Sequence, residues 1–398
     1  MDATTEQRMT RLIFVCSFLI STIVLALLAL KQPIKTNIAA SYLWGAALVI
    51  GTMVISSLTR KRRKLLRLFL LASVLNLILV PPEAYLRFKG FRYESGIQFG
   101  YPRPYQFSVF EPHETLFWRF PPSLPGVNSY GFEGPEVKQP KPPGTYRILF
   151  VGNSCMYQGY PHMIELILRK HYAGVECINF ANPGYTTYQG KVLIKSYIDD
   201  LNPDLVVVAY GWNDRWLAYG AVDEEKQIHI SSSKAADILR SIYSKWRLLQ
   251  FFRKALGPVL GRIEPLGTPR VPIDHFMKNL LEIGNECSRR GIPTIFATEP
   301  GSHPVLGVPD YITTSEYATS KESSLALFKE YNEAVRKIAT EREDWHLIDL
   351  DSLISYRNDV REIFTGDGFH FTRSGLALVA EIESRFIAAH ILAEEQER

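Results

Sequence analysis

The eleven residues DLVVVAYGWND, Asp204–Asp214, set the architecture of this chain. The first seven form a short and almost continuous apolar run, which is typical of a strand buried on both faces of a parallel sheet. The polar residues from Gly211 to Asp214 then follow the point where this strand ends. Because ligands of an open parallel sheet bind at the carboxyl ends of its strands, we expect functional side chains at this edge.

Strand-like and helical segments alternate along residues 146–398. Four more apolar runs have the length of strands, at 147–151, 175–180, 292–298 and 346–350. Segments with apolar residues at helical spacing accompany them, at 161–172, 188–201, 273–290, 323–340 and 373–392. This pattern predicts an α/β fold, a flavodoxin-like three-layer sandwich with a five-stranded parallel sheet.

An insertion at residues 215–272 interrupts this alternation. Within it, residues 238–256 are basic and carry apolar side chains at helical spacing from Ile242 to Phe252. The segment predicts an amphipathic helix. Such a helix either covers the core as an ordinary element or forms a lid that rests on a membrane surface or shapes an acyl pocket.

Charge is distributed unevenly along the chain. The net charge is +4, but residues 1–88 hold eleven Lys/Arg and only three Asp/Glu. The excess positive charge therefore belongs to the N-terminal part, and we expect no nucleic-acid-binding domain. The four cysteines are widely spaced, without a CxxC or metal-ligand pattern, so neither a disulfide framework nor a metal site is expected.

Residues 1–87 predict a membrane anchor with about three transmembrane helices. Leu12–Leu30 is an uncharged run of 19 residues, which is long enough to cross the hydrocarbon core. A second run covers Ile38–Leu58, and a third, weaker run covers residues 66–86. A signal peptide is the alternative for the first run, although three successive runs favour an anchor.

The orientation of the anchor follows from a basic cluster at residues 60–64, between the second and third runs. Such clusters are typical of cytoplasmic loops. Three spans then place everything after Arg87 outside the cytoplasm, whereas two spans would leave it inside. We expect a multi-pass protein of the inner or cytoplasmic membrane, an extended lead-in at 88–145, and an extracytoplasmic domain at 146–398.

Four short polar motifs fall at predicted strand ends. They are Ser154, Gly184, Asn213 and the block Asp367-Gly368-Phe369-His370. A serine on a strand-to-helix turn can act as a nucleophile, and a histidine oriented by an aspartate can take its proton. Glycine and asparagine N–H groups can stabilise an oxyanion. Each motif alone also fits a helix cap, a turn or a solvated pair; their order along the strand ends favours chemistry.

These blocks resemble those of the SGNH hydrolases, also called the GDSL esterase/lipase family. The resemblance covers residues 146–392, and the segment 128–136 resembles the lead-in of bacterial, membrane-anchored members. It implies the SGNH hydrolase fold and a serine esterase that needs no cofactor. The catalytic residues that it implies are Ser154, Asp367 and His370, and the oxyanion-hole residues are Ser154, Gly184 and Asn213.

The chain departs from the family pattern beside the nucleophile. Asn153 stands where the family usually has Asp, and it loses a charge while keeping hydrogen-bonding capacity. Cys155 is a rival nucleophile, although its side chain should point elsewhere on a tight turn. Trp212 and Tyr185 are candidate binding residues that either stack on sugar rings, line an acyl site or pack in the core.

Three functions stay open on this sequence. The favoured one is a membrane-anchored serine esterase that hydrolyses O-acyl esters, for example acetyl esters, of envelope glycan or lipid. The second is an O-acyltransferase on cell-envelope polysaccharide, which would use the same site and require a separate envelope-biosynthesis partner in the membrane. The third is a catalytically degenerate domain that binds glycan.

Overall fold

A computed structural model of the chain describes residues 78–79, 81–87, 89–91, 110–226, 246–256 and 265–393. The chain divides into two compact units. The smaller unit comprises Met1–Glu94 and Ser233–Gly261, and the larger comprises Ser95–Ser232 and Arg262–Arg398. Most of the lead-in therefore belongs to the same unit as the predicted sheet, and the middle of the insertion belongs to the smaller unit.

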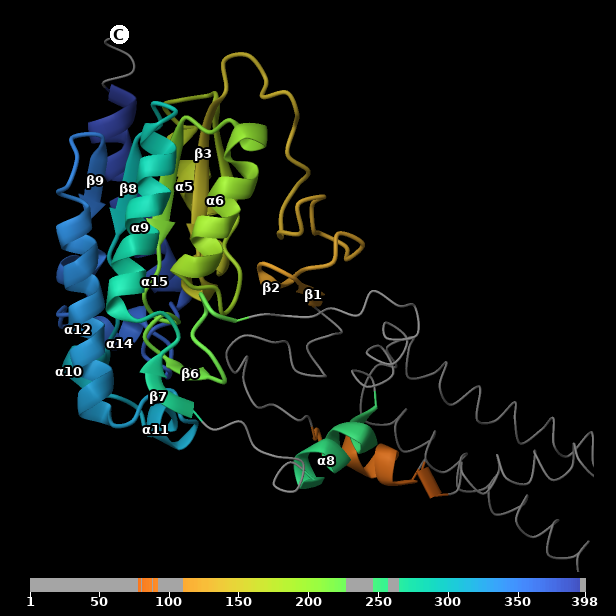
Figure 1. The fold of residues 1–398 in the computed structure, drawn as a ribbon. Coiled ribbons are helices and arrows are strands. Elements are labelled where there is room, and N and C mark those ends of the chain that lie inside the picture. The colour runs from red at the N-terminus through yellow and green to blue at the C-terminus, as the bar shows by residue number, and fades with distance from the viewer. Residues whose placement is uncertain are drawn as a thin grey trace, which may run out of the picture. The chain divides into compact units, whose positions relative to one another are not determined.

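A five-stranded sheet forms the centre of the larger unit (Figure 1). In spatial order its strands are β4 (Val175–Asn179), β3 (Tyr146–Gly152), β5 (Leu205–Ala209), β8 (Thr294–Ala297) and β9 (Trp345–Ile348). Every neighbouring pair is parallel. In chain order this is the 2-1-3-4-5 arrangement of flavodoxin-like sheets. The predicted α/β fold with a five-stranded parallel sheet is confirmed.

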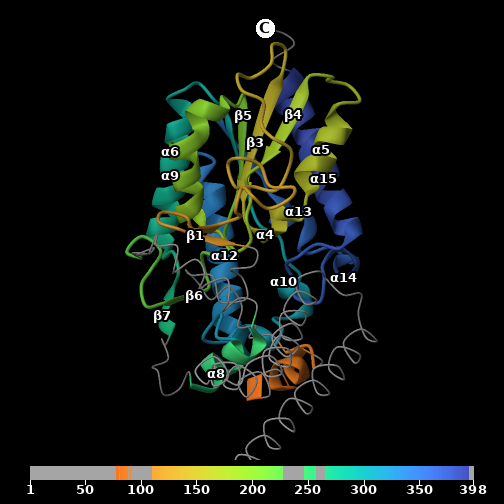
Figure 2. The same cartoon turned by 90° about the vertical axis from the view of Figure 1, so that its right-hand side faces the viewer.

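Helices cover both faces of this sheet (Figure 2). One face carries α6 (Thr187–Leu201), α9 (Ile273–Ser288) and α12 (Lys321–Ile338), and the other carries α5 (Tyr160–Leu168) and α15 (Arg373–Ile387). Side chains of β3 alternate between the two cores, with Leu149 and Val151 in one and Ile148 and Phe150 in the other. Since both faces are covered, the central strands are apolar throughout.

Several short elements were not predicted from the sequence. Two antiparallel pairs join β1 (Glu111–His113) to β2 (Phe117–Arg119) and β6 (Leu217–Tyr219) to β7 (Pro265–Pro269). The remaining short helices are α4 (Ser154–Tyr157), α10 (His303–Leu306), α11 (Tyr311–Thr314), α13 (Leu350–Ile354), α14 (Val360–Ile363) and the π-helical η2 (Ala388–Leu392). Most of them lie in the connections that follow the strands.

The lead-in packs on the core through both apolar and polar contacts. Phe132 stacks on Phe180 with 4.1 Å between ring centroids, and Trp118 is fully buried in the same cluster. The buried Arg147 guanidinium donates to the Lys138 carbonyl at 3.0 Å. Because a buried guanidinium needs its hydrogen bonds satisfied, this contact fixes the lead-in next to β3.

In the smaller unit, α8 (Arg247–Leu256) begins at an acidic side chain. The Glu83 carboxylate accepts hydrogen bonds from the backbone N–H groups of Arg247 at 3.1 Å and Leu248 at 2.7 Å. An anion at this place satisfies free N–H groups and complements the helix dipole. The helix predicted for 238–256 is present over the described residues 247–256.

None of the helices in the described residues is long and apolar enough to cross a membrane. The predicted spans Leu12–Leu30 and Ile38–Leu58 lie outside the described residues. Of the third run, only 78–79 and 81–86 are described, and these residues are helical. The membrane anchor therefore stays a prediction.

A pair of substitutions on α5 tests the core. Ile164→Ala empties a fully buried position, and we expect it to lower the free energy of unfolding by about 2–5 kcal/mol. Leu166→Ala, on the same helix but 54% exposed, should change it by less than about 0.5 kcal/mol. Thermal and urea unfolding of the full-length chain measure both, and equal losses would contradict this packing.

Candidate active site

Ser154 lies on the turn between β3 and α4. β3 ends at Gly152, and Ser154 is the first residue of α4. Asn153 caps this helix, because its Oδ1 accepts the Cys155 N–H at 2.9 Å. The buried cap fixes the backbone of the turn, while Ser154 itself is only partly buried. A hydroxyl is thereby held at the carboxyl edge of the sheet, as predicted.

Asp367 and His370 lie on the turn that precedes α15, and they meet Ser154. His370 Nε2 is 2.8 Å from Ser154 Oγ, and His370 Nδ1 is 2.7 Å from Asp367 Oδ2. An ionised carboxylate only accepts hydrogen bonds, so Nδ1 carries the proton and Nε2 is free to accept from the serine. The three predicted catalytic side chains thus form one chain of hydrogen bonds with the polarity of a Ser-His-Asp triad.

The pKa of Asp367 keeps it ionised at neutral pH. Burial alone would raise this pKa, but the hydrogen bond and charge of His370 and the N–H groups of His370 and Phe369 lower it to about 2. Its Oδ1 accepts those N–H groups at 3.0 and 3.1 Å. One carboxylate oxygen therefore shapes the turn while the other orients the imidazole.

The Gly184 peptide is turned so that its N–H is available. Gly184 has φ of 83°, a left-handed conformation that favours glycine. Its carbonyl accepts from Arg270 Nη1 at 2.8 Å. Within the described residues, neither the Gly184 N–H nor the Ser154 N–H has a hydrogen-bond acceptor. Two backbone N–H groups, in the loops that follow β3 and β4, therefore remain available to a ligand.

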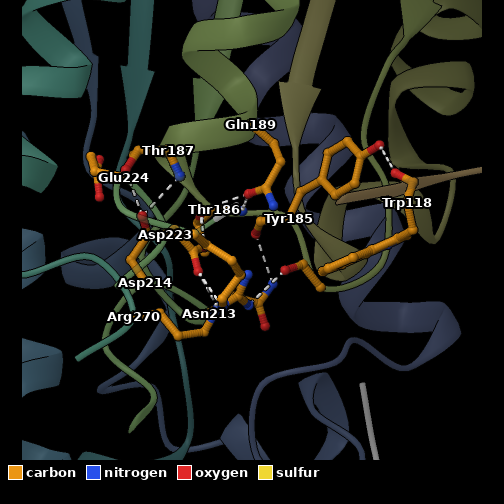
Figure 3. Close-up of polar contacts among 12 residues, drawn as sticks. Trp118, Tyr185, Thr186, Thr187, Gln189, Asn213, Asp214, Asp223, Glu224 and Arg270 are labelled. Carbon is orange, nitrogen blue, oxygen red and sulfur yellow. Dashed lines mark hydrogen bonds and ion pairs between the residues drawn. The ribbon is translucent and has the colours of Figure 1, made fainter. Parts of the chain in front are cut away.

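Asn213, on the loop after β5, contributes an amide that lies against Tyr185 (Figure 3). Its Nδ2 donates to the Tyr185 carbonyl at 2.9 Å, which fixes the orientation of the amide. An amide nitrogen has two N–H donors, so one remains after this bond. The geometry fits the predicted oxyanion-hole role of Asn213, with the side chain held by the loop that carries Gly184.

A buried polar network supports these loops from beneath (Figure 3). Asp223 accepts from Arg270 Nη2 at 2.8 Å and from Thr186 Oγ1 at 2.9 Å. Asp214 Oδ1 accepts from the N–H and hydroxyl of Thr187 at 2.8 and 2.6 Å. Although these bonds oppose it, burial raises the pKa of Asp214 to about 7. Asp214 thus ties the β5 loop to the start of α6.

The structure corrects the predicted binding role of Trp212 and Tyr185. Trp212 is 2% exposed, and the Arg215 guanidinium carbon lies 3.5 Å from its ring centroid. Tyr185 is fully buried, and its hydroxyl donates to the Trp118 carbonyl at 2.6 Å. Both side chains pack beneath the loops that carry them, so neither reaches a substrate.

Cys155 does not compete with Ser154. Its thiol is buried, and its Sγ lies 3.4 Å from the Phe369 carbonyl oxygen. Burial and the nearby Glu299 and Asp367 carboxylates raise the pKa of this thiol well above its usual range. A neutral thiol that faces a carbonyl is a poor nucleophile.

Two residues that the sequence prediction missed hold the site together. Gln158 Nε2 donates to the Phe371 carbonyl at 3.0 Å, and its Oε1 accepts the Phe371 N–H at 2.9 Å, so α4 is clamped to the residue after His370. Glu299 bonds to Asn153 and to the residue before Asn213. No sequence signal marks Gln158. Glu299 follows the apolar run of β8 at the same sheet edge, and that placement was a usable signal.

A family model matches residues 150–378, more than half of the chain, and describes the GDSL-like lipase/acylhydrolase family. The chain belongs to this family. It is therefore a hydrolase that acts on ester bonds. No curated protein matches the chain significantly. Within the described residues there is no group of three His, Cys, Asp or Glu side chains that could hold a metal ion.

Solved structures of similar fold include lipases and esterases. A lipase/acylhydrolase from Enterococcus faecalis is 19% identical, with 61% of this chain and 95% of that chain covered and a TM-score of 0.39. The acetyl xylan esterase AlAXEase is 18% identical, with 61% and 99% covered and a TM-score of 0.40. A catalytic mutant of the acetylxylan esterase Axe2 from Geobacillus stearothermophilus is 15% identical, with 61% and 94% covered and a TM-score of 0.38.

Asp367→Asn tests how the imidazole is oriented. The new side chain must keep its oxygen on the Phe369 and His370 N–H groups, which turns its NH₂ toward His370 Nδ1. The imidazole proton then moves to Nε2, which can no longer accept the serine proton. We expect kcat on a nitrophenyl ester to fall by about 10²–10⁴-fold, with KM and the melting temperature nearly unchanged. A kcat within threefold of the native value would contradict this orientation.

Proposed function

We propose that this chain is a membrane-anchored serine esterase that cleaves O-acyl esters through an acyl-enzyme on Ser154. The observation that carries the proposal is the continuous chain of hydrogen bonds from Asp367 through His370 to Ser154, at 2.7 and 2.8 Å. Nucleophile, base and orienting acid within hydrogen-bond reach are the signature of nucleophilic acyl transfer. Membership of an acylhydrolase family supports the same chemistry.

In the first half of the reaction, Ser154 Oγ attacks the ester carbonyl while His370 Nε2 takes the hydroxyl proton. Asp367 stabilises the imidazolium that forms. The tetrahedral oxyanion is stabilised by the Ser154 N–H, the Gly184 N–H and the Asn213 amide, since preorganised donors act most strongly where charge develops. His370 then returns its proton to the leaving alcohol.

In the second half, water attacks the acyl-enzyme and His370 acts as base again. The proton returns to Ser154 as the acid product leaves, and the site is restored without a cofactor. A sugar hydroxyl could replace the water, and the enzyme would then be an O-acyltransferase. We favour hydrolysis because the family is one of acylhydrolases.

The substrate that we propose is an acyl ester, for example an acetyl ester, on an envelope glycan or lipid. The apolar runs Leu12–Leu30, Ile38–Leu58 and 66–86 support a membrane anchor of three spans. With three spans, the basic cluster at 60–64 supports a domain outside the cytoplasm. Proteolysis of sealed cells or spheroplasts tests this orientation. Cleavage of the C-terminal domain only after lysis would contradict an extracytoplasmic site.

Ser154→Ala tests the acyl-enzyme. We expect hydrolysis of a short-chain nitrophenyl ester by the folded full-length protein to fall at least about 10³-fold, because the nucleophile is lost. A fluorophosphonate probe should label the native chain at Ser154 and should not label the variant.

Cys155→Ala is the matched control on the same turn. It should keep the labelling and most of the activity, since the Cys155 thiol is buried. A native chain that the probe fails to label would favour the degenerate, glycan-binding alternative. Product analysis with and without a sugar acceptor separates hydrolysis from acyl transfer.

A further inference from the structure

Glu299 lies beneath the active site, just after β8. It is 4% exposed, and its backbone is fixed by a reciprocal pair with Asn332 of α12. The Glu299 N–H donates to Asn332 Oδ1, and Asn332 Nδ2 donates to the Glu299 carbonyl, both at 3.0 Å. The carboxyl group is therefore held on a rigid base rather than on a mobile loop.

The two oxygens of this carboxyl group hold two different loops. Oε1 accepts from Asn153 Nδ2 at 2.6 Å, and Oε2 accepts from the Trp212 N–H at 2.5 Å. Asn153 is the residue before Ser154, and Trp212 is the residue before Asn213. One side chain therefore fixes both the nucleophile turn and the loop of an oxyanion donor.

The donor and acceptor roles of Asn153, Trp212 and Glu299 are fully determined. Asn153 must present its oxygen to the Cys155 N–H, which it accepts at 2.9 Å, so its NH₂ points at Glu299. The Trp212 N–H is also a donor. Position 299 must then accept with both oxygens, and an ionised carboxylate does so best.

The surroundings provide a countercharge for this carboxylate. Burial raises the pKa of Glu299 to about 7, while the hydrogen bonds from Trp212 and Asn153 and the positive charges of Arg215 and His370 act against it. Arg215 is itself buried, 3% exposed, with its guanidinium over the Trp212 ring. A buried acid that accepts two hydrogen bonds and lies near a positive charge is an element of a site rather than a defect of the core.

We infer that Glu299 is a positioning residue of this active site, and that the Asn153–Glu299 pair replaces the aspartate that usually precedes the nucleophile in this family. In this chain the carboxyl group stands at position 299 and faces the amide of Asn153, and that amide sets the direction of the hydrogen bond between them. The inference rests on the proposed catalytic role of Ser154. It explains why the Asn153 departure is compatible with an active enzyme.

An exchange of the two functional groups is the sharpest test. Asn153→Asp alone places two carboxylates 2.6 Å apart in a buried site, where like charges repel. In Glu299→Gln alone, the new amide oxygen can accept only one of the two N–H groups. Its NH₂ then faces the other donor, which is either the Asn153 NH₂ or the Trp212 N–H. The double variant Asn153→Asp/Glu299→Gln can form all three hydrogen bonds of the native cluster again. Its new amide at position 299 donates to the new carboxylate at position 153 and still accepts the Trp212 N–H.

The readouts are the rate of fluorophosphonate labelling of Ser154, kcat and KM on a nitrophenyl ester, and the melting temperature of the full-length chain. We expect each single substitution to lower kcat and the labelling rate by at least about tenfold with KM little changed, since misplaced reacting groups cost mainly turnover. The double variant should return both to within about threefold of the native values. Glu341→Gln, an exposed glutamate after α12, is the matched control and should change nothing.

Two outcomes would overturn the inference. One is a double variant whose fold-decrease in kcat equals the product of the decreases in the two single variants. The other is single variants with native kcat and labelling rate. If a single variant does not fold, the double variant decides alone, because the exchange requires it to fold and to be labelled at a near-native rate. A native chain that is not labelled at Ser154 would instead refute the proposed function, so the two failures are distinguishable.

Discussion

The parallel pairing of β3 with β4 on one side and β5 on the other is the constraint from which the site follows. Parallel strands end at the same edge, so the loops that leave these three neighbours meet there without long excursions. Those loops carry Ser154, Gly184 and Asn213. His370 reaches them from beyond the last strand, and the Gln158 bonds to Phe371 hold it in place.

Beneath this edge of the sheet, charged side chains occupy core positions that are usually apolar. Asp214, Asp223, Arg270, Arg215 and Glu299 are all almost completely buried. Each bonds to a backbone group, a neighbouring side chain or an aromatic ring of the loops above. Buried polar groups tolerate few alternative arrangements, because an unmet bond inside the protein is costly. The network therefore gives the loops above it one conformation.

The sheet, the helices on its two faces and the three triad residues could be predicted from the sequence. Apolar runs such as 204–210 and helical periodicity carry that information locally. Tyr185 and Trp212 could not be placed, because an aromatic residue after a strand fits the rim and the core equally well, and tertiary packing decides. Glu299 and Gln158 act through partners that are 146 and 213 residues away in the chain. No local sequence signal marks the Gln158 contact, and the place of Glu299 after the β8 run marks the residue but not its partners.

The contact between Asn153 and Glu299 also bears on how relatives of this chain should be compared. The two positions share one negative charge and one hydrogen bond, so neither can change freely while the other stays. Among related chains they should vary together, with an acid at one position matched by an amide at the other. A relative with Asn before its serine is then to be judged by the second residue after its fourth sheet strand, and not by the missing aspartate alone.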